Sequence, residues 1–91
     1  MFKITQGKGF QVTFANGWTA SVQFGVENYC ANRLPLGRNA EEVSCANAEI
    51  CAWRGVYREY HDFGGGRTEE GYKTAEAVAE FLCEIAAKPQ Q

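Results

Sequence analysis

The chain has 91 residues and a formal net charge of −2, which is enough for one domain with a single core and too little for two. The slight acidic excess argues against a general nucleic-acid-binding protein, which would carry a basic patch. The charge is uneven, because the first 40 residues are net basic and the remainder is net acidic. No apolar run approaches the length needed to cross a bilayer, so we expect no membrane partner.

Residues 1–5 alternate between apolar and polar side chains and predict a short first strand. Residues 9–24 contain two alternating runs that meet at an Asn-Gly pair, which predicts a hairpin. A two-residue turn would put the two apolar rows on opposite faces. A three-residue loop at 15–17 instead sets Phe14 opposite Trp18 and brings both rows to one face. We therefore expect a type I turn followed by a bulge, with the glycine in the left-handed region.

The middle of the chain is less regular. Residues 25–47 show no sustained period and contain many turn-forming residues, although 39–44 could form one helical turn. Residues 48–53 and 56–63 predict a third and a fourth strand, and a run of three glycines predicts a turn before a short edge segment at 67–72. We expect one face of these two strands to carry Ile50, Ala52, Val56 and Tyr60, and the other to carry Cys51, Trp53, Tyr57 and Phe63.

Residues 75–88 predict an α-helix, with Thr74 as the N-cap, Glu76 in the first turn and Pro89 beyond its end. Its apolar residues recur at i, i+3, i+4 and i+7, so one side of the helix faces a core. Together the elements predict an α+β fold in a single domain, residues 1–91. It consists of an antiparallel sheet of four to five strands, built from two hairpins, with the C-terminal helix packed on one face. The other face should be open to water or to a partner.

Cysteine and histidine are the residues that could support metal or nucleophilic chemistry, and these are Cys30, Cys45, Cys51, Cys83 and His61. No secretory signal is visible, so we expect reduced thiols in a cytoplasm, with two disulfides as the alternative. Five residues separate Cys45 from Cys51, which is wider than the usual spacing of paired zinc ligands. No nucleophile and base form a local signature around His61. We therefore expect no cofactor, no metal and no catalytic set.

Two groups of residues are better candidates for recognising a partner, because Tyr, Trp and Arg are enriched where proteins meet. One is a loop at 28–33, and the other is the ring-bearing face near residues 53–58. The candidate partner-binding residues are Asn28, Tyr29, Arg33, Trp53, Arg54, Tyr57 and Arg58. Two alternatives remain: Tyr29 could anchor its loop onto the core, and the irregular segment could fold over the rings of the second group.

The run GFQVTFANGWTASVQFG at 9–25, followed by NYCANR at 28–33, resembles small proteins encoded by tailed bacteriophages and prophages. Residues 75–87 resemble the helix that ends such proteins. The resemblance assigns no catalytic residue. It implies a non-enzymatic protein that acts in the host cytoplasm by binding a host protein or complex, such as an inhibitor of a CRISPR-type antiviral system. A homodimer, a small-ligand (nucleotide) binder and a zinc or thiol enzyme are the alternatives.

Overall fold

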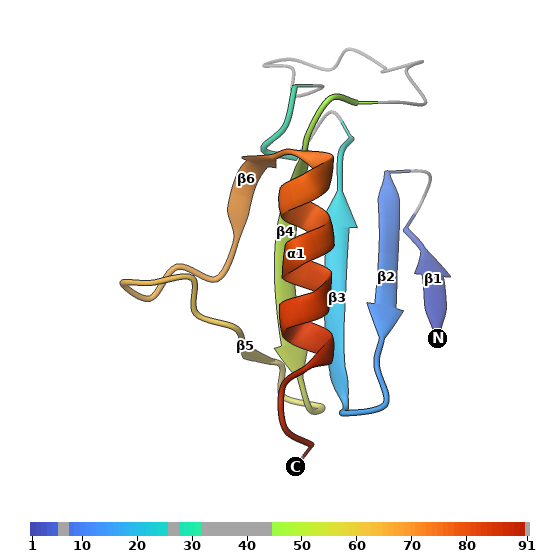
Figure 1. Ribbon diagram of the computed structural model, residues 1–91, viewed down its shortest axis with the longest axis vertical. Coiled ribbons are helices and arrows are strands. Elements are labelled where there is room, and N and C mark those ends of the chain that lie inside the picture. Colours follow the sequence, from blue (N-terminus) through green and yellow to red (C-terminus); the bar gives the residue numbers. More distant parts are fainter. Residues whose placement is uncertain (6–7, 26–27, 32–44, 91) are drawn as a thin grey trace.

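The computed structural model describes residues 1–5, 8–25, 28–31 and 45–90. These residues form a six-stranded antiparallel sheet with one helix packed on it (Figure 1), so the predicted α+β class is confirmed, with one strand more than expected. The elements are β1 (Phe2–Ile4), β2 (Gly9–Thr13), β3 (Trp18–Gln23), β4 (Ala48–Arg54), β5 (Glu59–Tyr60), β6 (Glu70–Lys73) and α1 (Ala75–Ala86). The strand order is β1-β2-β3-β4-β5, and β6 also pairs with β4. The helical turn expected at 39–44 lies outside the described residues.

The β2–β3 hairpin has the predicted three-residue loop. The Phe14 amide donates to Trp18 O at 2.8 Å, and the Gly17 amide donates back to Phe14 O at 3.0 Å. Gly17 has φ +89, the left-handed conformation that glycine adopts without strain. In the resulting register Val12 opposes Ala20, and all the large apolar residues of the hairpin share one face.

The helix begins as predicted. The Thr74 hydroxyl accepts a hydrogen bond from the Ala77 amide at 3.2 Å, which satisfies one amide of the first turn. The helix ends at Ala86, two residues earlier than expected. Its buried side chains pack against the hairpin face and against alternate residues of β4. The buried core consists of Val12, Trp18, Ala20, Val22, Ala48, Ile50, Ala52, Phe81 and Ile85.

The hairpin loop also holds the C-terminal end of α1. The Asn16 side-chain amide donates to Ile85 O at 2.9 Å and to Lys88 O at 3.0 Å, while its oxygen accepts from the Trp18 amide at 3.0 Å. The last carbonyls of a helix lack partners within the helix. One side chain therefore stabilises the turn and satisfies the end of the helix, although about 70 residues separate them.

The predicted assignment of the residues after β4 to the two faces of the sheet is wrong in part. β5 is only two residues long, and Trp53 pairs with Tyr60, so these two rings share the face away from the helix. Val56 is in the preceding turn and is almost fully exposed. Phe63 lies under the helix, where it stacks on Phe81. Strand alternation could not predict this, because a turn at 55–58 interrupts the alternation between β4 and β5, and the chain leaves the sheet again after β5.

The helix covers only part of one face. It contacts β3 and β4, and β1 and β2 extend beyond it (Figure 1). In the described part of the chain, no helix is long and apolar enough to cross a membrane. The arrangement leaves three surfaces to consider: the space between the helix and the β5–β6 connection, the face without a helix, and the edge strand β1.

Replacing Asn16 tests the link between the hairpin and the helix. In Asn16→Asp, the oxygen that accepts from the Trp18 amide is kept, but the donor to the helix carbonyls becomes a carboxylate facing the negative end of the helix dipole. We expect Asn16→Ala to lower the free energy of unfolding by about 1–3 kcal/mol, and Asn16→Asp to lower it further at pH 7. Urea unfolding followed by circular dichroism measures both.

The two variants should converge as the pH is lowered toward about 4, because protonation removes the charge of the new aspartate. Equal stability of Asn16→Asp and the unsubstituted chain at pH 7 would contradict the proposed link.

Candidate functional site

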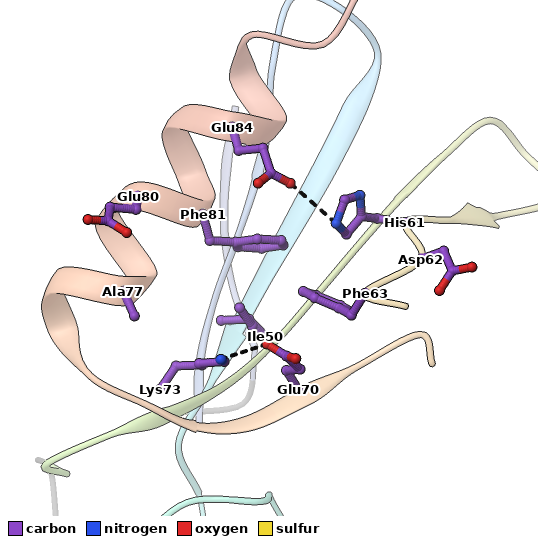
Figure 2. A pocket seen from close by; sticks show the side chains of 10 residues that line it. All are labelled: Ile50, His61, Asp62, Phe63, Glu70, Lys73, Ala77, Glu80, Phe81 and Glu84. Atoms are coloured by element: carbon purple, nitrogen blue, oxygen red, sulfur yellow. Dashed lines mark ion pairs between the residues drawn. The ribbon is translucent and has the colours of Figure 1, made fainter. Parts of the chain in front are cut away.

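A pocket of about 450 Å³ lies between α1 and the segment that connects β5 to β6 (Figure 2). We call it the acidic pocket. It is lined by Ile50, His61, Asp62, Phe63, Glu70, Lys73, Ala77, Glu80, Phe81 and Glu84. Its residues come from β4, from the connection, from β6 and from one side of the helix, so no short stretch of sequence contains it.

Aromatic rings form the floor of the acidic pocket. Phe63 and Phe81 stack with their centroids 5.4 Å apart. His61 meets Phe63 edge to face at 4.8 Å, and it contacts Phe81 at 5.9 Å. Such edge and stacked contacts hold rings in fixed relative positions. The floor is therefore built from packed side chains, and His61 is one of its structural members.

Four carboxylate residues line the pocket beside this floor. Glu84 Oε2 lies 3.3 Å from His61 Nε2 across the pocket, and Glu80 is exposed one helical turn before it (Figure 2). Glu70 Oε1 pairs with Lys73 Nζ at 2.6 Å, and this hydrogen bond lowers the pKa of Glu70, assisted by further charge from Lys73. Asp62 Oδ1 accepts from two backbone amides of the glycine turn. Figure 2 shows the Asp62 and Glu80 side chains pointing away from the rings, and Arg67 also pairs with Glu70 at 3.0 Å. The lining thus contains four carboxylate residues against one lysine and is net acidic, with two of the four carboxylates directed outward.

This combination fits a cationic group with an apolar stem. A guanidinium or ammonium could pair with the carboxylates while its methylenes cover the rings, and aromatic faces also attract cations. A nucleotide fits poorly, because its phosphates would be repelled by the same carboxylates. The pocket therefore has the chemistry of a binding site for lysine or arginine side chains.

The structure brings together two rings and one guanidinium, of which Trp53 and Arg58 belong to the predicted second group. Arg58 lies over the Trp53 ring at 4.6 Å, and Trp53 contacts Tyr60 at 6.0 Å, all on the face without a helix. Tyr57, in the turn before β5, is 97% exposed. Tyr60 was not among the predicted binding residues, although its position two residues after Arg58 in a predicted strand could have suggested it.

Arg54 does not join this group, contrary to the expected arrangement. It lies on the helix-bearing face, where its guanidinium stacks over Trp18 at 5.4 Å and pairs with Glu59 at 2.9 Å. The hydrogen bond from Arg54 lowers the pKa of Glu59. Trp18 receives Lys88 as well, with Nζ 4.8 Å from its ring. These contacts give Arg54 a structural role at the base of the helix.

The first predicted group is integrated into the fold. Asn28 Oδ1 accepts from the Gly25 amide at 2.8 Å, and Asn28 Nδ2 donates to Glu49 at 3.2 Å. The backbone carbonyl of Tyr29 accepts from the Tyr72 amide at 2.8 Å, while the Tyr29 side chain is 43% exposed. The loop is thus attached to β4 and β6 through its backbone and Asn28. Arg33 lies outside the described residues.

The cysteines do not converge with His61. All four lie in the described part of the chain, and none forms a disulfide. Cys51 is on the face without a helix, where it opposes Ser21, whereas His61 is packed on the other face. Burial raises the pKa of Cys51 to about 11, and Glu49 adds to the effect. Among residues 1–5, 8–25, 28–31 and 45–90, no group of three or more His, Cys, Asp or Glu side chains could hold a metal.

Sequence reasoning missed the acidic pocket. The available signal was weak: Glu80 and Glu84 lie four residues apart on one side of the helix, and Asp62 stands between a histidine and a phenylalanine. Comparisons with protein-family models, with curated proteins and with solved structures found no match to this chain.

Alkylation of the thiols tests the environment of Cys51. Because the thiolate is the reactive form, we expect iodoacetamide at pH 8 to modify Cys51 about a hundredfold more slowly in the folded protein than in urea. The exposed Cys83 should react readily in both conditions. Peptide mass spectrometry over time measures each site. Comparable rates for Cys51 in the folded and unfolded chains would show that burial does not protect it.

Proposed function

We propose that this chain is a non-enzymatic binding protein of a phage or prophage that engages a basic surface of a host protein through its acidic pocket. The observation that supports this most is the pocket itself, whose lining combines a floor made of Phe63, Phe81 and His61 with four carboxylate residues. Of these carboxylates, Glu80 is exposed and has no ion-pair partner among the described residues, so it is available to a cation.

The pocket has features of a recognition site for a charged side chain. Its aromatic floor gives a partner side chain an apolar contact, and its carboxylates give that contact a preference for positive charge. The volume, about 450 Å³, accommodates one or two long side chains rather than a folded element. We infer that lysine or arginine side chains from a larger partner surface enter here.

The nature of the partner follows from the same charge. Proteins that handle nucleic acid carry basic grooves, because they must bind phosphates. An acidic protein that occupies such a groove competes with the nucleic acid. Together with the resemblance of residues 9–25 and 28–33 to phage and prophage proteins, this makes a CRISPR-type antiviral complex in the host cytoplasm our first candidate partner, and inhibition of that complex the proposed outcome.

Charge reversal at the pocket tests the proposal. We expect affinity purification of the unsubstituted chain from the bacterial host to yield a stoichiometric partner with a basic surface. Glu80→Lys should weaken binding to that purified partner about tenfold or more, since a like charge is then placed against the partner's cations. Isothermal titration calorimetry at two salt concentrations measures the loss and shows whether the affinity falls with salt, as charge pairing requires.

Glu69→Lys is the matched control. It makes the same change in charge at an exposed position that does not line the pocket. We expect it to bind as tightly as the unsubstituted chain. Equal weakening by both substitutions would show that only the net charge of the protein matters, and would contradict a specific role for the pocket. A partner that binds Glu80→Lys as tightly as the unsubstituted chain would contradict it too.

A further inference from the structure

The edge strand β1 presents free backbone groups. The Thr13 amide donates to Met1 O at 2.8 Å, and the Thr5 amide donates to Gly9 O at 3.1 Å, so residues 1, 3 and 5 bond toward β2. Because hydrogen-bonded and non-hydrogen-bonded positions alternate along an antiparallel strand, Phe2 and Ile4 point their amides and carbonyls away from the sheet. β1 is at one end of the strand order, so these groups face solvent.

The two apolar side chains of β1, Phe2 and Ile4, are exposed on the helix-bearing face. Phe2 is 79% exposed and Ile4 is 80% exposed, although they lie opposite Val12 and Phe10 of β2, which contribute to the core. The helix does not reach them, since its contacts are with β3 and β4 (Figure 1). A single exposed apolar residue is ordinary, but two that alternate along an open edge form a template for another strand.

We propose that β1 binds an extended segment of a partner protein as an additional antiparallel strand, and that the segment has the pattern apolar–acidic–apolar. The outward groups of Phe2 and Ile4 would make four backbone hydrogen bonds to the two apolar positions of the segment. Those positions would share a face with Phe2 and Ile4 and cover them. The acidic residue would lie opposite Lys3.

Lys3 determines which position of the partner segment should be acidic. It opposes Gln11 on β2, so its side chain lies on the face without a helix. Within the described part of the chain it makes no ion pair. The residue directly opposite Lys3 on an added strand would be its nearest neighbour on that side, and an opposite charge there is favourable whereas a like charge is not.

Charge and area both argue against a second copy of this chain as the occupant. Two antiparallel β1 strands could bond all the outward backbone groups of Phe2 and Ile4 only if Phe2 of each copy paired with Ile4 of the other. Lys3 would then lie directly opposite Lys3 of the partner subunit. The strand is three residues long, so its pairing would bury far less than the roughly 800 Å² per partner of a standard interface. The proposal is also independent of the acidic pocket, which lies beyond β4, near the opposite edge of the sheet.

A peptide titration tests the proposal. The probe is the acetylated and amidated pentapeptide threonine-valine-glutamate-valine-threonine, added to the 15N-labelled chain with any purification tag at the C-terminal end. We expect amide chemical-shift changes centred on Phe2, Lys3 and Ile4. A peptide with lysine in place of glutamate should bind about two- to fivefold more weakly, and Lys3→Glu should reverse this preference.

Two substitutions of Ile4 separate strand addition from a general loss of folding. Ile4→Pro removes an outward amide but no hydrogen bond to β2, so it should abolish peptide binding while the amides of β2 and β3 keep their shifts. Ile4→Val keeps the amide and should still bind.

Three results would overturn the proposal: shift changes located elsewhere, no reversal of preference in Lys3→Glu, or no binding at millimolar peptide. Sedimentation velocity that shows a dimer dissociated by Ile4→Pro would overturn it as well, and would identify a second copy as the occupant.

Discussion

The position of α1 over β3 and β4 is the constraint from which the other surfaces follow. Phe81 and Ile85 pack against the face formed by the hairpin and β4, and the Asn16 side chain donates a hydrogen bond to a carbonyl in the last turn of the helix. One helix is narrower than a six-stranded sheet, so it cannot cover a whole face. The acidic pocket on one side of the helix and the bare β1 strand on the other are both consequences of where the helix lies.

The two sides of the helix differ in chemistry. Glu80 and Glu84 line the acidic pocket, and Glu84 reaches His61 of the β5–β6 connection, whereas Val78 and Leu82 pack against the core. The lining of the pocket is suited to a positively charged group, and the region toward β1 offers backbone groups and apolar side chains. The two proposed binding modes therefore have different physical bases and share no residues.

Local patterns predicted the parts of the fold in which neighbours in sequence determine the geometry. The alternation of apolar residues on the two strands specified the loop length, because both apolar rows lie on one face only when Phe14 is opposite Trp18. The Thr74 cap and the helical stripe were likewise predictable. The faces of Tyr60 and Phe63 were not, since a turn at 55–58 interrupts the alternation before Tyr60 and the chain leaves the sheet before Phe63.

By itself, the sequence determined an α+β domain in which a hairpin and an amphipathic helix share a core, because apolar periodicity specifies which sides of each element must be buried. Only the tertiary structure decided that Arg54 stacks on Trp18 while Arg58 covers Trp53, and that Asp62, Glu70, Glu80 and Glu84 line one pocket. The physical reason is that charged residues on the surface are not buried, so they follow no periodic sequence pattern from which their neighbours could be predicted. Their proximity arises from packing between segments far apart in the chain.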